Sequence, residues 1–86
     1  MKFEKEGLLG SYDEKCDILY IYYKGRDYSY GTEDPDDFVT FRSISDDTLT
    51  GYLIYGFKDK ISRGVIDISR FDLVFKVVVE KLAKEL

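Results

Sequence analysis

The stretch YDEKCDILYIYY, residues 12–23, contains the strongest β-strand pattern in the chain. Its last six residues, 18–23, are all apolar or aromatic, and β-branched and aromatic side chains favour strands. Successive strand residues alternate between two faces, so Tyr20 and Tyr22 share a face with Ile18, while the opposite face is equally apolar. A strand that is apolar on both faces is normally covered on both.

The acidic half of this stretch predicts a turn. Asp13 is placed to accept hydrogen bonds from the backbone N–H groups just ahead of it. A functional alternative pairs Asp13 with Asp17 as acid and base, and another treats Cys16 beside Lys15 as a thiol of lowered pKa. We interpret both aspartates as turn caps and Cys16 as an ordinary, semi-buried cysteine.

A second two-faced strand occurs in residues 49–57, which we predict to form a β-hairpin with residues 38–44 through the polar turn SDDT. In this strand Tyr52 and Ile54 share one face, and the other face is also apolar. Gly51 and Gly56 indicate a bulge or a close approach of another segment. Weaker strand patterns cover residues 2–9, ended by Gly10 and Ser11, and residues 28–31.

The last part of the chain has a helical period. The pattern predicts a C-terminal helix over residues 70–85, with Ser69 as its N-cap. Its apolar residues fall within one stripe at about 100° per residue. The stripe comprises Phe71, Val74, Phe75, Val78, Val79, Leu82 and Leu86. Leu73 and Val77 form a small apolar spot on the opposite side. Residues 61–68 fit either a short strand or a helical turn.

We therefore predict a single α+β domain over residues 1–86, with an antiparallel sheet of about four strands and one C-terminal helix packed on it. One helix covers one face of a sheet. Either another chain covers the second face, or the N-terminal segment and residues 61–68 cover it, or a curved sheet or small barrel buries it on itself. We favour the first alternative and expect a homo-oligomer. The predicted interaction surface comprises Tyr20, Tyr22, Tyr52, Ile54, Leu73 and Val77.

The composition excludes several classes of chemistry. The chain has no His and a single Cys, which excludes His-activated nucleophiles, an internal disulfide and a cysteine-based zinc site. The net charge of −4 argues against a nucleic acid or an anionic membrane as partner. We predict a cytoplasmic protein that is not an enzyme and has no cofactor and no metal.

An acidic segment around Pro35 offers the main alternative function. Glu33, Asp34, Asp36 and Asp37 gather carboxylates of the kind that bind Ca²⁺ or Mg²⁺, but their spacing lacks the pattern of a calcium-binding loop. We interpret the segment as a solvated turn. The alternative is a ligand- or metal-binding module that uses residues 33–37 and the tyrosine face of the sheet.

Several segments resemble, in order and spacing, a family of small prokaryotic proteins called domain of unknown function 2283. The matching pieces are YD at 12–13, Asp17, LYI at 19–21, DD at 36–37, SDD at 45–47 and LTGYLIYGF at 49–57, so the resemblance covers about residues 12–60. Leu53 departs from it, because the family usually has an acidic residue there.

The resemblance implies a compact β-sheet fold and supplies no catalytic residues. Its members often look like one half of a two-gene pair similar to toxin–antitoxin modules. On this basis we expect a protein that acts by protein–protein association, as the antitoxin-like half of such a pair. Its acidic, tyrosine-rich surface would cover the active site of a small basic partner.

Overall fold

The computed structural model describes residues 1–25, 28–34, 37–66 and 71–85. Within these residues six strands form one antiparallel sheet: β1 (Lys2–Lys5), β2 (Leu8–Asp13), β3 (Ile18–Tyr23), β4 (Ser29–Asp34), β5 (Phe38–Ser43) and β6 (Leu49–Tyr55). Two helices follow, α1 (Phe57–Arg63) and α2 (Leu73–Glu85). The α+β class and the C-terminal helix are confirmed, and the predicted number of about four strands is corrected to six.

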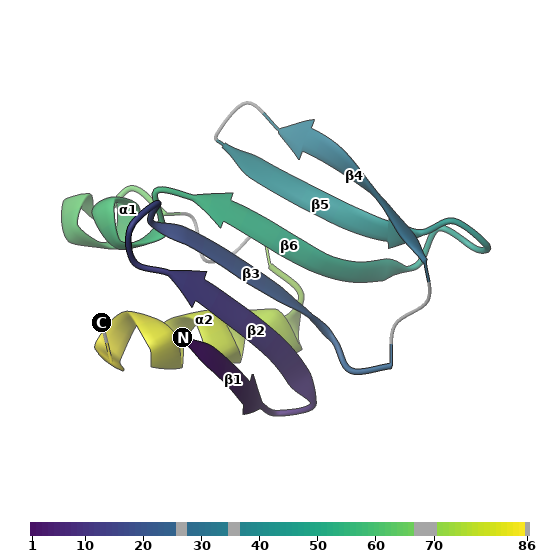
Figure 1. Cartoon of the computed structure of the whole chain (residues 1–86), viewed down its shortest axis with the longest axis horizontal. Helices are drawn as coiled ribbons and strands as arrows, with labels where there is room; N and C mark the ends of the chain where they lie inside the picture. The colour runs from purple at the N-terminus through teal and green to yellow at the C-terminus, as the bar shows by residue number, and fades with distance from the viewer. Residues whose placement is uncertain (26–27, 35–36, 67–70, 86) are drawn as a thin grey trace.

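The strand order is β1-β2-β3-β6-β5-β4. Two three-stranded meanders, β1-β2-β3 and β4-β5-β6, are therefore joined side by side through β3 and β6. Figure 1 shows the sheet as an open, twisted layer with α2 lying across its far side. The described part of the sheet has two edges, β1 and β4, so it does not close into the small barrel that the sequence left open as an alternative.

The N-terminal segment differs most from its prediction. It contains two strands, and β2 continues through Gly10 and Ser11, where the sequence predicted a break. Packing explains why glycine stands at this position. A Cβ atom at Gly10 would lie only 2.1 Å from the ring of Phe3 on the paired strand. Gly10 therefore allows the ring to lie against the sheet and does not end the strand.

The second meander contains the predicted hairpin, with β5 and β6 paired antiparallel. It also contains β4, which is longer than the strand predicted at 28–31 and includes Thr32 to Asp34 of the predicted loop. Gly56 has a φ of 66° and ends β6 two residues earlier than predicted. The chain then turns directly into α1, so the helical alternative is correct for residues 61–63, and residues 67–68 lie outside the described part.

Helix α2 covers one face of the sheet and completes the core. Phe75 is fully buried, and its ring contacts those of Tyr23 and Tyr52 edge-on, at 4.9 Å between centroids in both cases. The buried residues of the predicted stripe are Phe71, Phe75, Val78, Val79 and Leu82. Val74 is an exception at 37% exposure, and the predicted N-cap Ser69 and stripe residue Leu86 lie outside the described residues. From the sheet, the core receives Leu8, Tyr12, Leu19, Ile21, Phe38, Tyr52 and Ile54.

Candidate functional site

The turn between β2 and β3 stabilises the fold through its two aspartates. The Asp13 Oδ1 atom accepts hydrogen bonds from the backbone N–H groups of Lys15 at 3.0 Å and Cys16 at 3.2 Å, which confirms the predicted turn cap. Cys16 is exposed, so its predicted partial burial is wrong. The turn positions Asp17 with a φ of 54°, a left-handed conformation that Asp tolerates better than most residues.

Asp17 caps helix α1 from a distant part of the chain. Its carboxylate accepts hydrogen bonds from the backbone N–H groups of Lys58 at 2.7 Å and Asp59 at 3.0 Å. The Tyr12 hydroxyl donates a third bond to Oδ1 at 2.7 Å. The Asp17 carbonyl also accepts the N–H of Gly56 at 2.7 Å. Asp17 therefore joins the β2–β3 turn to the end of β6 and the start of α1.

Both partners of the Tyr12–Asp17 bond have shifted pKa values. Burial alone would raise the pKa of Asp17, but the hydrogen bonds from Tyr12 and from the α1 backbone outweigh it and hold that pKa below its usual value. Burial and the bond to Asp17 raise the pKa of Tyr12 to about 12. Both shifts therefore follow from burial and from the hydrogen bonds that join Tyr12, Asp17 and the start of α1.

The acidic segment at 33–37 is only partly described, because residues 35–36 lie outside the described part. Glu33 and Asp34 end the edge strand β4, and Asp34 Oδ2 accepts a bond from the Thr40 hydroxyl at 3.2 Å. Asp37 lies 3.8 Å from the Nζ atom of Lys60. Across the described ranges no group of three or more His, Cys, Asp or Glu side chains is arranged to hold a metal ion.

The predicted interaction surface is divided between two faces of the sheet and one side of a helix. Tyr20 and Tyr22 lie on the face away from α2 and are partly exposed. Tyr52 and Ile54 are 6% and 0% exposed beneath α2, so they belong to the core and cannot contribute to a binding surface. The strand register explains the error, because Tyr20 pairs with Leu53 and not with Tyr52.

The two predicted helix residues lie apart from this face. Leu73 is 75% exposed and Val77 is partly exposed. Both belong to α2, which contributes its buried stripe to the opposite side of the sheet. The helix spot and the two tyrosines are therefore separate surfaces.

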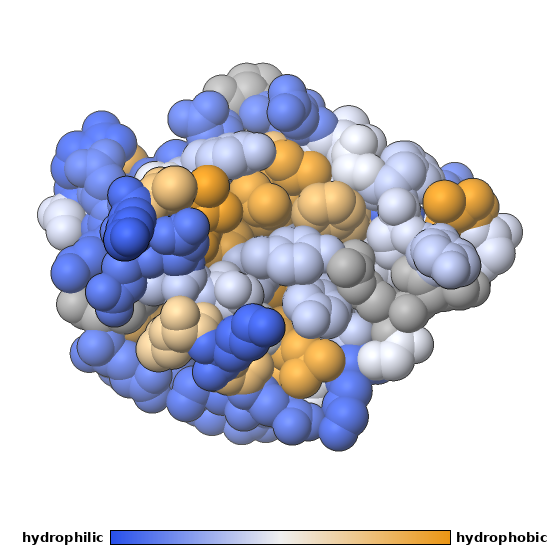
Figure 2. All heavy atoms as spheres, viewed as in Figure 1, coloured by the Kyte–Doolittle hydropathy of each residue, from blue (hydrophilic) through white to orange (hydrophobic). Residues whose placement is uncertain are grey.

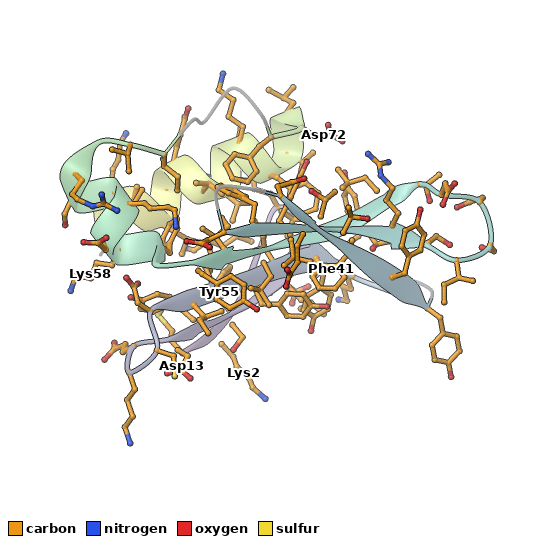
Figure 3. All side chains as sticks on the ribbon, turned by 90° about the horizontal axis from the view of Figure 1, so that it is seen from above. Lys2, Asp13, Phe41, Tyr55, Lys58 and Asp72 are labelled. Carbon is orange, nitrogen blue, oxygen red and sulfur yellow. The ribbon has the colours of Figure 1, made fainter. Side chains whose placement is uncertain are left out.

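The face away from α2, here called the open face, is the candidate site. Directly paired residues of neighbouring strands lie on the same face, so the registers define it. Its apolar and aromatic members are Leu9, Ile18, Tyr20, Tyr22, Val39, Phe41, Leu53 and Tyr55. Figure 2 views this face and shows hydrophobic residues across its middle, with strongly hydrophilic residues around much of its margin. Figure 3 shows Phe41 and Tyr55 on the side of the sheet opposite α2.

Three aromatic rings gather at the centre of the open face. The ring centroid of Tyr20 lies 4.8 Å from that of Tyr22 and 5.4 Å from that of Phe41. Gly51 lies between Tyr22 and Phe41 in the same cross-strand row. A Cβ atom at Gly51 would lie 2.4 Å from the Ile21 carbonyl oxygen and 2.8 Å from Tyr22 Cβ, so a larger residue does not fit there. Glycine therefore allows strands β3 and β6 to approach closely here, which corresponds to the close approach that was one of the two alternatives predicted for Gly51.

The sequence predicted two of these rings as surface residues but did not indicate that Phe41, Leu9 and Leu53 belong to the same surface. Alternation had already placed apolar residues on both faces of each strand. The missing information was the neighbour relation between β3 and β6, which are separated by two strands in the chain. Only that relation places Tyr20 beside Leu53 and shows which face of β6 is directed away from α2.

Comparisons of the chain with family models, curated proteins and solved structures find no match. The resemblance to domain of unknown function 2283 therefore stays a prediction from the quoted residues. Among the described residues, no helix is both long enough and apolar enough to cross a membrane.

Proposed function

We propose that this protein is a non-catalytic binding module that associates with another protein chain through its open face. The observation that carries the proposal is the asymmetry of the two sheet faces. One face is buried under α2, and the other has a continuous apolar and aromatic surface on which no described helix lies. Apolar patches of this kind, with polar residues around them, are typical of protein interfaces.

The composition of the open face supports association with a protein. Tyr20, Tyr22 and Phe41 are ring residues of the kind enriched at interface cores, and Tyr combines an apolar ring with a polar hydroxyl that tolerates water before binding. The rows through Tyr20 and Tyr22 have charged side chains only at their β1 and β4 ends, and Asp13 lies at the end of β2 beside Ile18. Such an arrangement favours burial of the centre and solvation of the rim.

The resemblance noted in the sequence adds a hypothesis about the biological role. In that hypothesis the protein is the antitoxin-like half of a two-gene pair, and it neutralises a small basic protein by covering its active site. The net charge of −4 suits a basic partner, because complementary charge increases the rate of encounter. Its natural compartment in this hypothesis is the cytoplasm.

A matched pair of variants tests which surface binds. Phe41→Glu introduces a charge into the open face, and Leu73→Glu introduces the same charge on the outer side of α2. Each variant is examined by sedimentation velocity, alone and after co-expression with the product of the neighbouring gene. We expect Phe41→Glu to abolish complexes that the wild type forms and Leu73→Glu to retain them.

Circular dichroism establishes that both variants keep the fold. Tyr20→Thr, which keeps a side chain suited to strands, serves as a second open-face variant if Phe41→Glu is poorly folded. Loss of the complex with Leu73→Glu and its survival with both open-face variants would assign binding to the helix and overturn the proposal.

A further inference from the structure

We propose that the open face binds a second copy of this chain, through a two-fold axis that runs parallel to the strands between β3 and β6. This inference rests on the association proposed above and names its partner. The two sheets stack face to face, with β3 of each copy over β6 of the other. Stacked sheets keep their strand directions within about 30° of each other, and an axis along the strands satisfies this condition.

The evidence is the order of side chains in one cross-strand row of the open face. From the β1 edge to the β4 edge, the registers align Lys2, Ser11, Tyr20, Leu53, Val39 and Glu33. The row thus has a cation at one edge, an anion at the other and mostly apolar side chains between them. A rotation of 180° about an axis along the strands reverses the row, so Lys2 of each copy faces Glu33 of the other.

The charges distinguish this arrangement from one with the axis across the strands in the same row. That axis would stack β1 on β1 and β4 on β4, which brings Lys2 against Lys2 and Glu33 against Glu33. Like charges at facing positions oppose association, and unlike charges favour it. Exposed ion pairs contribute little to affinity, so we assign Lys2 and Glu33 the role of fixing the orientation of the two copies.

The apolar part of the interface comes from the same reversal. It places Tyr20 opposite Leu53 of the second copy in the first row. In the next row, which runs Glu4, Leu9, Tyr22, Gly51, Phe41 and Gly31, it places Leu9 opposite Phe41. Each large ring of one copy therefore faces a smaller side chain of the other, which allows the two layers to interdigitate as in a β-sandwich.

One pair of like charges lies at the end of the stacked sheets. The rotation brings Asp13 of one copy toward Asp37 of the other. Asp13 accepts two backbone hydrogen bonds within its turn, and Asp37 lies 3.8 Å from the Lys60 ammonium. Asp13 lies in the last row of the open face, beside Ile18 and Tyr55, at the ends of the strands, where water and Lys60 reduce the repulsion.

The size of the open face predicts a weak but specific dimer. Six strands spaced about 4.8 Å apart, with about 3.3 Å per residue, give a face of about 30 Å by about 20 Å. Stacking two such faces buries about 1,200 Å² in total, which is the lower end of the range for specific interfaces. We therefore expect a dissociation constant in the micromolar range.

Charge reversal at the two edges tests both the partner and the axis. Sedimentation equilibrium of the protein alone at low salt should show a species of twice 10.0 kDa. Lys2→Glu and Glu33→Lys, made singly, should each raise the dissociation constant about tenfold, because two facing pairs per dimer become like-charged. The double variant should return to within about threefold of the wild type, and high salt should reduce all these differences.

The outcomes separate this inference from the proposed function. No rescue in the double variant would show that Lys2 does not face Glu33, which overturns the proposed axis. A wild type that stays monomeric at all concentrations would overturn the dimer altogether. In that case the proposed function stands if Phe41→Glu abolishes the complex with the product of the neighbouring gene. If that complex survives in Phe41→Glu, the proposed function fails together with the dimer.

Discussion

Replacing Asp17 with alanine should destabilise the protein far more than the position of this residue in a surface turn indicates. The substitution removes the two bonds from the α1 backbone and the bond from the buried Tyr12 hydroxyl. Loss of a helix cap costs about 0.5–2 kcal/mol. Leaving a buried hydroxyl without its acceptor costs about 1–3 kcal/mol. We therefore expect the free energy of unfolding to fall by about 2–4 kcal/mol from these bonds.

A second aspartate provides the control for backbone strain. Alanine at φ 54° adds a penalty of about 1–2 kcal/mol for the left-handed conformation. Asp37 has a φ of 61°, and its Lys60 partner is 3.8 Å away. Asp37→Ala therefore introduces the same backbone strain but does not break three hydrogen bonds as Asp17→Ala does. The difference between the two variants isolates the cap. In a domain of this size, Asp17→Ala should therefore melt about 10–20 °C lower than Asp37→Ala.

The pH dependence of stability provides a second test of the Asp17 cap. The folded pKa of Asp17 is lowered, so its contribution is fully present above the unfolded value of about 3.9 and is lost as the pH falls through the folded pKa. Thermal melts by circular dichroism at pH 7 and at pH 2–3 should therefore show a smaller difference between Asp17→Ala and the wild type in acid. Equal melting temperatures for Asp17→Ala and Asp37→Ala at neutral pH would refute the cap.

The remaining predictions concern the helix and the acidic segment. Phe75→Ala removes a fully buried ring and should cost about 3–5 kcal/mol in denaturant unfolding. Leu73→Glu changes a side chain that is 75% exposed and should stay within about 0.5 kcal/mol of the wild type, and the reverse order would contradict the assigned helix face. Millimolar Ca²⁺ or Mg²⁺ should leave the melting temperature unchanged, and so should the triple change of Asp34, Asp36 and Asp37 to Asn. A metal-induced rise that this triple variant loses would support the metal-binding alternative.

Local patterns predicted the parts of the fold that depend on neighbours in the chain. The alternation in β3, the hairpin of β5 and β6 and the helical stripe around Phe75 all follow from side chains a few residues apart. The alternation also separated Tyr20 from Ile21 correctly. It could not show which face of β6 continues the face of Tyr20, because that depends on a pairing between segments separated by two intervening strands.

The contacts that the sequence could not reveal are those between distant segments. The sequence predicts Asp17 as a turn cap within its own loop, yet its carboxylate caps a helix 41 residues further along. Gly10 looked like a strand break, because nothing in its neighbourhood indicates that the Phe3 ring lies against it. In both cases the residue type is suited to a turn, and a tertiary contact decides what it does.

The division of the sheet into two meanders has a consequence for the kinetics of folding. Within each meander, strands pair with neighbours that follow directly in the chain, so these pairings close short loops and have low contact order. The pairing of β3 with β6 aligns Ile18 with Tyr55 and closes a loop of about 37 residues, which has a larger entropic cost. We therefore expect the transition state to be crossed when β3 and β6 meet, and substitutions near Gly51 to slow refolding more than substitutions at the β1 or β4 edges.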